Sequence, residues 1–82
     1  MRVKHLIDKI ISHNEIIAIW ETRSDAEHGV YHYQLWRGMA WDLSNKRPDL
    51  YKSKFVKIFG TIPKSIIEAD TINIEISNEK EN

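Results

Sequence analysis

The fold depends most on residues 15–22, whose sequence is EIIAIWET. This stretch is apolar through its middle and rich in β-branched isoleucine, with Glu15 at its start and Glu21 near its end. A short apolar run between charged residues is typical of a strand that is buried on both faces. We therefore predict a central strand here and expect the rest of the chain to be arranged around it.

A helix is predicted immediately before this strand. Between Val3 and Asn14 the apolar residues recur at spacings of three and four, which brings them to one face of a helix. Asn14 suits the position that ends such a helix, because its short amide tolerates a positive φ. A helix of about 12 residues is only marginally stable alone, so we expect it to pack on the sheet.

After the central strand, the chain is predicted to form a hairpin that turns at Arg37-Gly38. Residues 23–29 are polar and end in glycine, which indicates a loop. Residues 30–36 alternate in the manner of a strand, and residues 39–43 are typical of a short return strand after a tight turn.

The remaining residues are predicted to add one helical turn and two more strands. The helical turn falls at residues 48–52, and the strands fall at 55–60 and 71–76. In the second of these strands isoleucine alternates with polar residues, so one face of it points to the core. Residues 77–82 contain no apolar side chain and are predicted to be a disordered tail.

Together these elements predict a single α+β domain over residues 1–76. One N-terminal helix packs on a mostly antiparallel sheet of four or five strands, because short connections favour antiparallel neighbours. The expected core consists of Val3, Leu6, Ile7, Ile10, Ile17, Ile19, Leu35, Val56, Ile58, Ile72, Ile74 and Ile76.

The composition excludes several classes of protein. The 82 residues include no cysteine, so disulfides, thiolate metal sites and cysteine nucleophiles are excluded. Lys and Arg together number 12, as do Asp and Glu, so the net charge is zero and gives no general attraction to nucleic acid or anionic lipid. The longest apolar run, Ile16–Trp20, is far shorter than the roughly 20 residues that cross a bilayer. Since the start of the chain also lacks the apolar run of a signal peptide, we expect a cytoplasmic protein without membrane contact.

Catalytic and metal-binding patterns are not found in the sequence. His28 and His32 are four residues apart, but in a strand this separation spans roughly 13 Å, which is too far for one ion. Gly29, Gly38 and Gly60 stand alone, so no glycine-rich phosphate loop is present. We therefore expect neither an enzyme nor a metal or other cofactor.

Tryptophan and tyrosine are concentrated in the middle of the chain. A small core cannot bury all of them. In one interpretation two or three fill the core and the others cover strand backbone. In the other, some of them form a contact patch for a partner protein, because Trp, Tyr and Arg are enriched at interface hot spots. The residues assigned to this patch are Trp36, Arg37 and Trp41.

The alternation of residues 30–36 predicts which aromatic side chains are exposed. Tyr31 and Tyr33 lie on the opposite side of the strand from Trp36. We expect the two tyrosines to face the core together with Leu35, and Trp36 to lie on the open face of the sheet.

Basic residues are concentrated in residues 46–64, although the whole chain is neutral. One interpretation is a solvated loop whose lysines keep a sheet edge from aggregating. The alternative is a nucleic-acid-binding segment, in which cations neutralise phosphates and neighbouring aromatic rings stack on bases. The residues that would carry this alternative are Lys46, Arg47, Lys52, Lys54 and Lys57.

Two stretches carry a resemblance to a class of small proteins. They are LWRGMAWDL, residues 35–43, and DTINIEI, residues 70–76. In these stretches, and in its order of a short helix, a strand and a hairpin, the chain resembles small accessory proteins carried by phages and integrated mobile elements of Gram-positive bacteria. The resemblance implies a compact host-directed or element-maintenance protein, of a class in which some members bind and block another protein.

The sequence therefore favours a non-catalytic protein-binding accessory module. The expected partner is a protein that the sequence does not identify, and a second copy of this chain is a further candidate. Binding of nucleic acid through residues 46–64 is the alternative, and the two are distinguished by the steeper salt dependence of phosphate contacts.

Overall fold

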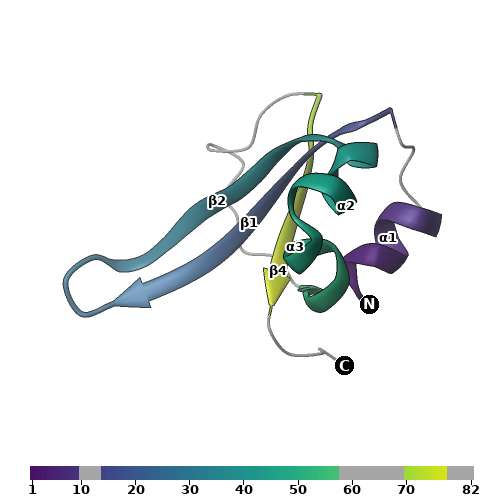
Figure 1. Cartoon of the computed structure of the whole chain (residues 1–82). Coiled ribbons are helices and arrows are strands. Elements are labelled where there is room, and N and C mark those ends of the chain that lie inside the picture. The colour runs from purple at the N-terminus through teal and green to yellow at the C-terminus, as the bar shows by residue number, and fades with distance from the viewer. Residues whose placement is uncertain (10–13, 58–69, 78–82) are drawn as a thin grey trace.

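The computed structural model describes residues 1–9, 14–57 and 70–77 (Figure 1). Within them the fold is α+β, as predicted, with an N-terminal helix, a four-stranded sheet and short helices after the second strand. In chain order the elements are α1 (Val3–Lys9), β1 (Ile16–Asp25), β2 (Gly29–Met39), the 3₁₀ helix η1 (Ala40–Asp42), α2 (Leu43–Lys46), α3 (Pro48–Ser53), β3 (Phe55–Val56) and β4 (Ile72–Ser77).

The strands of the sheet are ordered β2-β1-β4-β3. β1 pairs antiparallel with β2 and parallel with β4, and β4 pairs antiparallel with β3, so the sheet is mixed and mostly antiparallel. The parallel pair differs from what short connections suggest. It forms because a long connection, which includes the helices, carries the chain from β1 to β4.

β1 is the central strand that the sequence predicts. Its neighbours are β2 on one side and β4 on the other, and the four residues Ile17–Trp20 are all buried. Ile17 and Ile19 face the helices, whereas the side chain of Trp20 lies on the opposite face. There the indole Nε1 donates a hydrogen bond of 2.9 Å to Oδ1 of Asn73 on β4.

The helices cover one face of the sheet and complete the core there (Figure 1). The buried side chains of this core are Val3, Ile7, Ile17, Ile19, Ala40, Leu43, Leu50, Ile74 and Ile76. The predicted core residues that pack around it only half-buried are Leu6, Leu35, Val56 and Ile72, whereas Ile10 and Ile58 lie outside the described residues. The sequence prediction omits Leu43 because it treats residues 39–43 as a strand, and it omits Leu50 because it assigns no packing to the helical turn.

A polar contact joins two of the helices. Tyr51 of α3 donates a hydrogen bond from its hydroxyl to Oδ1 of Asp8 on α1. This contact raises the pKa of Tyr51 to about 12, because removal of the phenolic proton would place a second negative charge beside the carboxylate.

The hairpin turns at residues 26–28, so the predicted turn at Arg37-Gly38 is wrong. Residues 23–25 continue β1, and residues 40–43 are helical. The turn is made by Asp25, whose Oδ1 accepts the backbone N–H of Glu27 at 2.9 Å and also that of His28, and by Gly29 at a φ of 68°. Gly38 has a different role, since a Cβ there would lie 2.7 Å from the ring of Trp36.

A β-bulge explains why the predicted exposure of Trp36 is wrong. Ile19 pairs with Trp36 but Trp20 pairs with Gln34, which leaves Leu35 as an extra residue on β2. Leu35 and Trp36 therefore both pack against the core. Strict alternation would have placed them on opposite faces, and the bulge interrupts it at this point.

The predicted burial of Tyr31 and Tyr33 is also wrong, for a different reason. Their cross-strand partners are Arg23 and Glu21, which continue the helix-facing side of β1 beyond Ile19. The tyrosines thus lie on the predicted face, but the outer part of the hairpin extends past the described helices (Figure 1). Their exposed fractions are 36% for Tyr31 and 49% for Tyr33.

The packing of Trp36 predicts a large loss of stability on truncation. Trp36→Ala should lower the free energy of unfolding by about 3 kcal/mol, because it empties a site beside the core. Trp41→Ala is the control, since Trp41 is 52% exposed and such surface changes alter stability by about 0.5 kcal/mol or less. Denaturant melts of both variants measure the difference, and equal stabilities would contradict the bulge.

Candidate functional site

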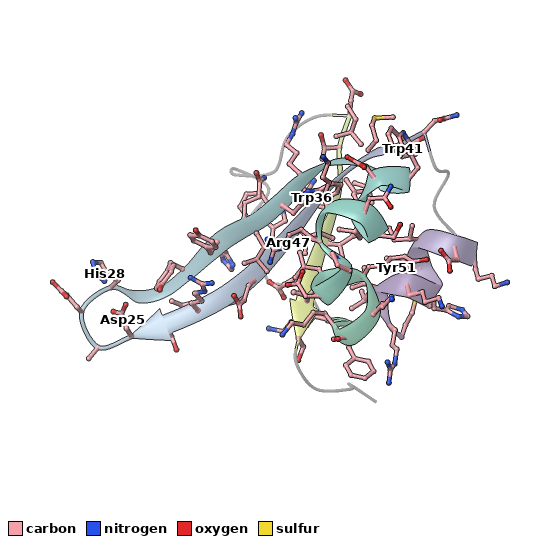
Figure 2. All side chains as sticks on the ribbon, in the orientation of Figure 1. Asp25, His28, Trp36, Trp41, Arg47 and Tyr51 are labelled. Atoms are coloured by element: carbon pink, nitrogen blue, oxygen red, sulfur yellow. The ribbon has the colours of Figure 1, made fainter. Side chains whose placement is uncertain are left out.

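The outer part of the hairpin is the most exposed feature of the described structure. We define the arm as residues 21–33, which comprise the end of β1, the turn and the start of β2. The arm projects beyond the helices, with Asp25 and His28 at its tip (Figure 2). Residues 24–31 of the arm are all exposed.

One face of the arm combines aromatic rings with a cation. We call this set, Glu21, Arg23, Tyr31 and Tyr33, the tyrosine face. The guanidinium carbon of Arg23 lies 4.2 Å from the centroid of the Tyr33 ring, within the range of a cation–π contact.

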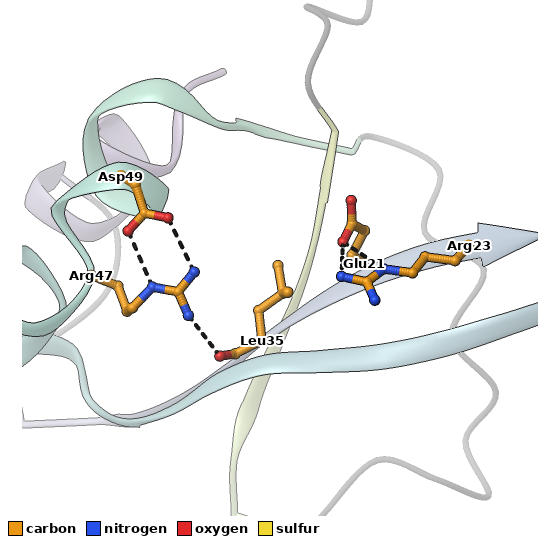
Figure 3. Close-up of polar contacts among 5 residues, drawn as sticks. All are labelled: Glu21, Arg23, Leu35, Arg47 and Asp49. Carbon is orange, nitrogen blue, oxygen red and sulfur yellow. Dashed lines mark hydrogen bonds and ion pairs between the residues drawn. The ribbon is translucent and has the colours of Figure 1, made fainter.

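Glu21 forms an ion pair with Arg23 (Figure 3). Oε2 of Glu21 accepts Nε of Arg23 at 3.0 Å and lies 2.9 Å from its Nη2. This hydrogen bonding raises the pKa of Arg23 above its ordinary value. The tyrosine face therefore combines two rings, a cation and its carboxylate partner.

The opposite face of the arm is tied to β4. Glu75 is only 4% exposed, and its Oε1 accepts the hydroxyl of Thr22 at 2.7 Å. Its Oε2 lies 3.4 Å from Nζ of Lys57. Nδ1 of His32 lies 3.1 Å from Oγ1 of Thr22 and 3.9 Å from Oε1 of Glu75. A buried carboxylate thus has a cation and a hydroxyl as partners, as its burial requires.

The side chains of Thr22, His32 and Glu75 form one polar cluster that joins β1, β2 and β4.

The predicted contact residues Trp36, Arg37 and Trp41 do not form one patch. Trp36 pairs with Ile19 on the core side, whereas Arg37 pairs with Ala18 and so lies on the other face of the sheet. Trp41 is exposed at the far end of the hairpin from the arm (Figure 2). Roles for Arg37 and Trp41 in binding stay predictions, while Trp36 packs against the core.

Two of the five predicted nucleic-acid contacts take part in the fold itself. Lys57 pairs with Glu75, and Arg47 pairs with both carboxylate oxygens of Asp49 at 3.0 and 3.1 Å (Figure 3). Nη1 of Arg47 also donates to the carbonyl oxygen of Leu35, the extra residue of the bulge, at 3.0 Å. Of the remaining three, Lys46 and Lys52 are exposed and Lys54 is half-buried.

An open pocket lies between α1 and Phe55, but it lacks the features of a specific ligand site. Its charged lining side chains, Arg2, Lys4, Asp8 and Lys9, are all exposed, and of these Asp8 accepts the Tyr51 hydroxyl while Arg2 donates to the carbonyl oxygen of Lys52. In the described ranges no three His, Asp or Glu side chains come together to hold a metal, and no helix is long and apolar enough to cross a membrane.

Comparison of the chain with protein-family models, with curated proteins and with solved structures gives no match. The sequence prediction missed Arg23 because it placed residues 23–29 in a loop. The signal was present in Asp25 and Gly29, since an aspartate that accepts turn N–H groups before a glycine is typical of a hairpin turn.

The Arg47 contact predicts that this residue stabilises the bulge. Arg47→Ala should lower the free energy of unfolding by about 1 kcal/mol, because it leaves the Leu35 carbonyl and Asp49 without their donor. Arg47→Lys should not restore it, since one ammonium group cannot replace the planar fork. Lys46→Ala, the control, should melt like the parent. Rescue by lysine would show that charge alone matters.

The turn at the arm tip should depend on pH through Asp25. The N–H of His28 lowers the pKa of Asp25 below its ordinary 3.8, so the turn gains stability above that pH and loses it as the pH falls through the lowered pKa. NMR titration should show the Glu27 and His28 amide shifts moving below pH 3.8. Asp25→Asn keeps an acceptor oxygen without titrating and should abolish this pH response. An Asp25 midpoint above its ordinary value would contradict the prediction.

Proposed function

We propose that the chain is a non-catalytic protein-binding module whose contact surface is the tyrosine face of the arm. One observation carries the proposal: Tyr31 and Tyr33 are exposed on an arm that projects beyond the core, and Arg23 lies over one of the rings. Tyrosine and arginine are enriched among residues that dominate interface energies.

A host-directed role in the cytoplasm, as in accessory proteins of phages and mobile elements, is part of this proposal. Such a protein would act by binding another protein and would catalyse no reaction. Binding of nucleic acid through residues 46–64 is less well supported, because Arg47 and Lys57 are engaged within the fold.

The proposal is tested by affinity capture from nuclease-treated bacterial lysate. The variant Tyr31→Ser with Tyr33→Ser should capture its partner about tenfold or more less efficiently than the parent, as expected for loss of hot-spot residues. Its melting should stay close to that of the parent, because both side chains are exposed.

The matched control is Lys46→Ser with Lys52→Ser, which removes two exposed cations. This variant should capture the partner like the parent, and capture should change little with salt. Capture that disappears with nuclease, or with the lysine changes but not the tyrosine changes, would overturn the proposal in favour of nucleic acid.

A further inference from the structure

Among the described residues, the outer edge of β2 lacks the usual protection of an edge strand. β2 lies at the end of the described strand order and pairs with β1 on its inner side. Natural edge strands are commonly guarded by lysine, proline or charge, because their unpaired backbone groups can join another strand. Residues 29–36 contain no proline, lysine, arginine or carboxylate. The bulge begins only at Leu35, so residues 29–34 form a regular stretch with no described strand on its outer side.

We propose that the occupant of this edge is a second copy of the same chain, paired antiparallel along β2. This inference rests on the proposed function and names its partner. In the register centred on His32, Tyr31 of each copy lies opposite Tyr33 of the second copy, on the same face of a continuous sheet. Aromatic pairs directly across neighbouring strands are favourable. A two-fold axis makes the contact self-complementary, as in most homodimers.

The charge distribution of β2 and its turn fits the same arrangement. Arg37 is the charged residue at one end of β2, and the acidic residues Asp25 and Glu27 lie at the other end, around the turn. An antiparallel arrangement brings the end of β2 that carries Arg37 toward the acidic turn of the second copy, whereas a parallel arrangement would bring like ends together.

The same register pairs two other side chains across the two copies, and substitutions at these two positions test the proposal. Val30 of each copy lies opposite Gln34 of the second copy. Val30 is 69% exposed, and both side chains lie on the face away from Tyr31 and Tyr33, as their partners Ser24 and Trp20 show. Substitutions at the two positions therefore leave the tyrosine face unchanged.

Sedimentation equilibrium of the full chain over a concentration series should show a monomer–dimer equilibrium. Val30→Lys with Gln34→Lys places lysine opposite lysine twice and should weaken the dimer about tenfold relative to Val30→Lys with Gln34→Glu, which places opposite charges together. Thermal melts establish that both variants are folded. A parent that stays monomeric at all concentrations, or two variants that dimerise equally, would overturn the proposal.

Disulfide trapping tests the register directly, because the chain has no cysteine of its own. A mixture of Val30→Cys and Gln34→Cys chains in oxidised glutathione should form the mixed disulfide about tenfold faster than either variant alone forms a homodimer, since like positions lie roughly 13 Å apart in this register. Equal rates would overturn it.

The outcomes separate this inference from the proposed function. A chain that stays monomeric while the tyrosine changes abolish lysate capture overturns the self-association and leaves the protein-binding function standing. A dimer that responds to the Val30 and Gln34 changes supports the inference even where the lysate yields no partner.

Discussion

Residues Ile17–Trp20 are buried on both faces of the sheet, and the rest of the structure depends on covering them. On one side the isoleucines of β1 and β4 need an apolar layer, which the helices provide. On the other side Trp20 must pair its indole N–H, and Asn73 accepts it. The position of β4 beside β1 brings Asn73 to this indole and Ile74 into the core.

The bulge in β2 is the second constraint, because it connects the sheet to the helices. The extra residue lets both Leu35 and Trp36 reach the core from adjacent positions. It also leaves a carbonyl that Arg47 satisfies, and Asp49 holds that arginine in place. Arg47, whose charge suggested a contact with nucleic acid, instead connects β2 to α3 through the Leu35 carbonyl and Asp49.

Beyond the bulge the same two strands become the arm. The helices end near the base of the hairpin, so the residues that continue the helix-facing side of the sheet are no longer covered (Figure 1). Exposed rings in this position would be a liability on an ordinary surface. Here Arg23, which is paired with Glu21, lies over the Tyr33 ring. The surface therefore combines apolar rings with charged groups, and this combination supports its interpretation as a contact site.

The sequence by itself determined the α+β class, the central strand and the core-facing isoleucines, because apolar run length and periodicity depend only on neighbouring residues. It also contained the turn signal at Asp25 and Gly29, although the prediction did not use it. Only the tertiary structure decided which aromatic side chains are exposed. The bulge shifts the facing of Trp36, and the reach of the helices leaves Tyr31 and Tyr33 uncovered. Both effects depend on contacts between residues far apart in the chain, which local patterns do not record.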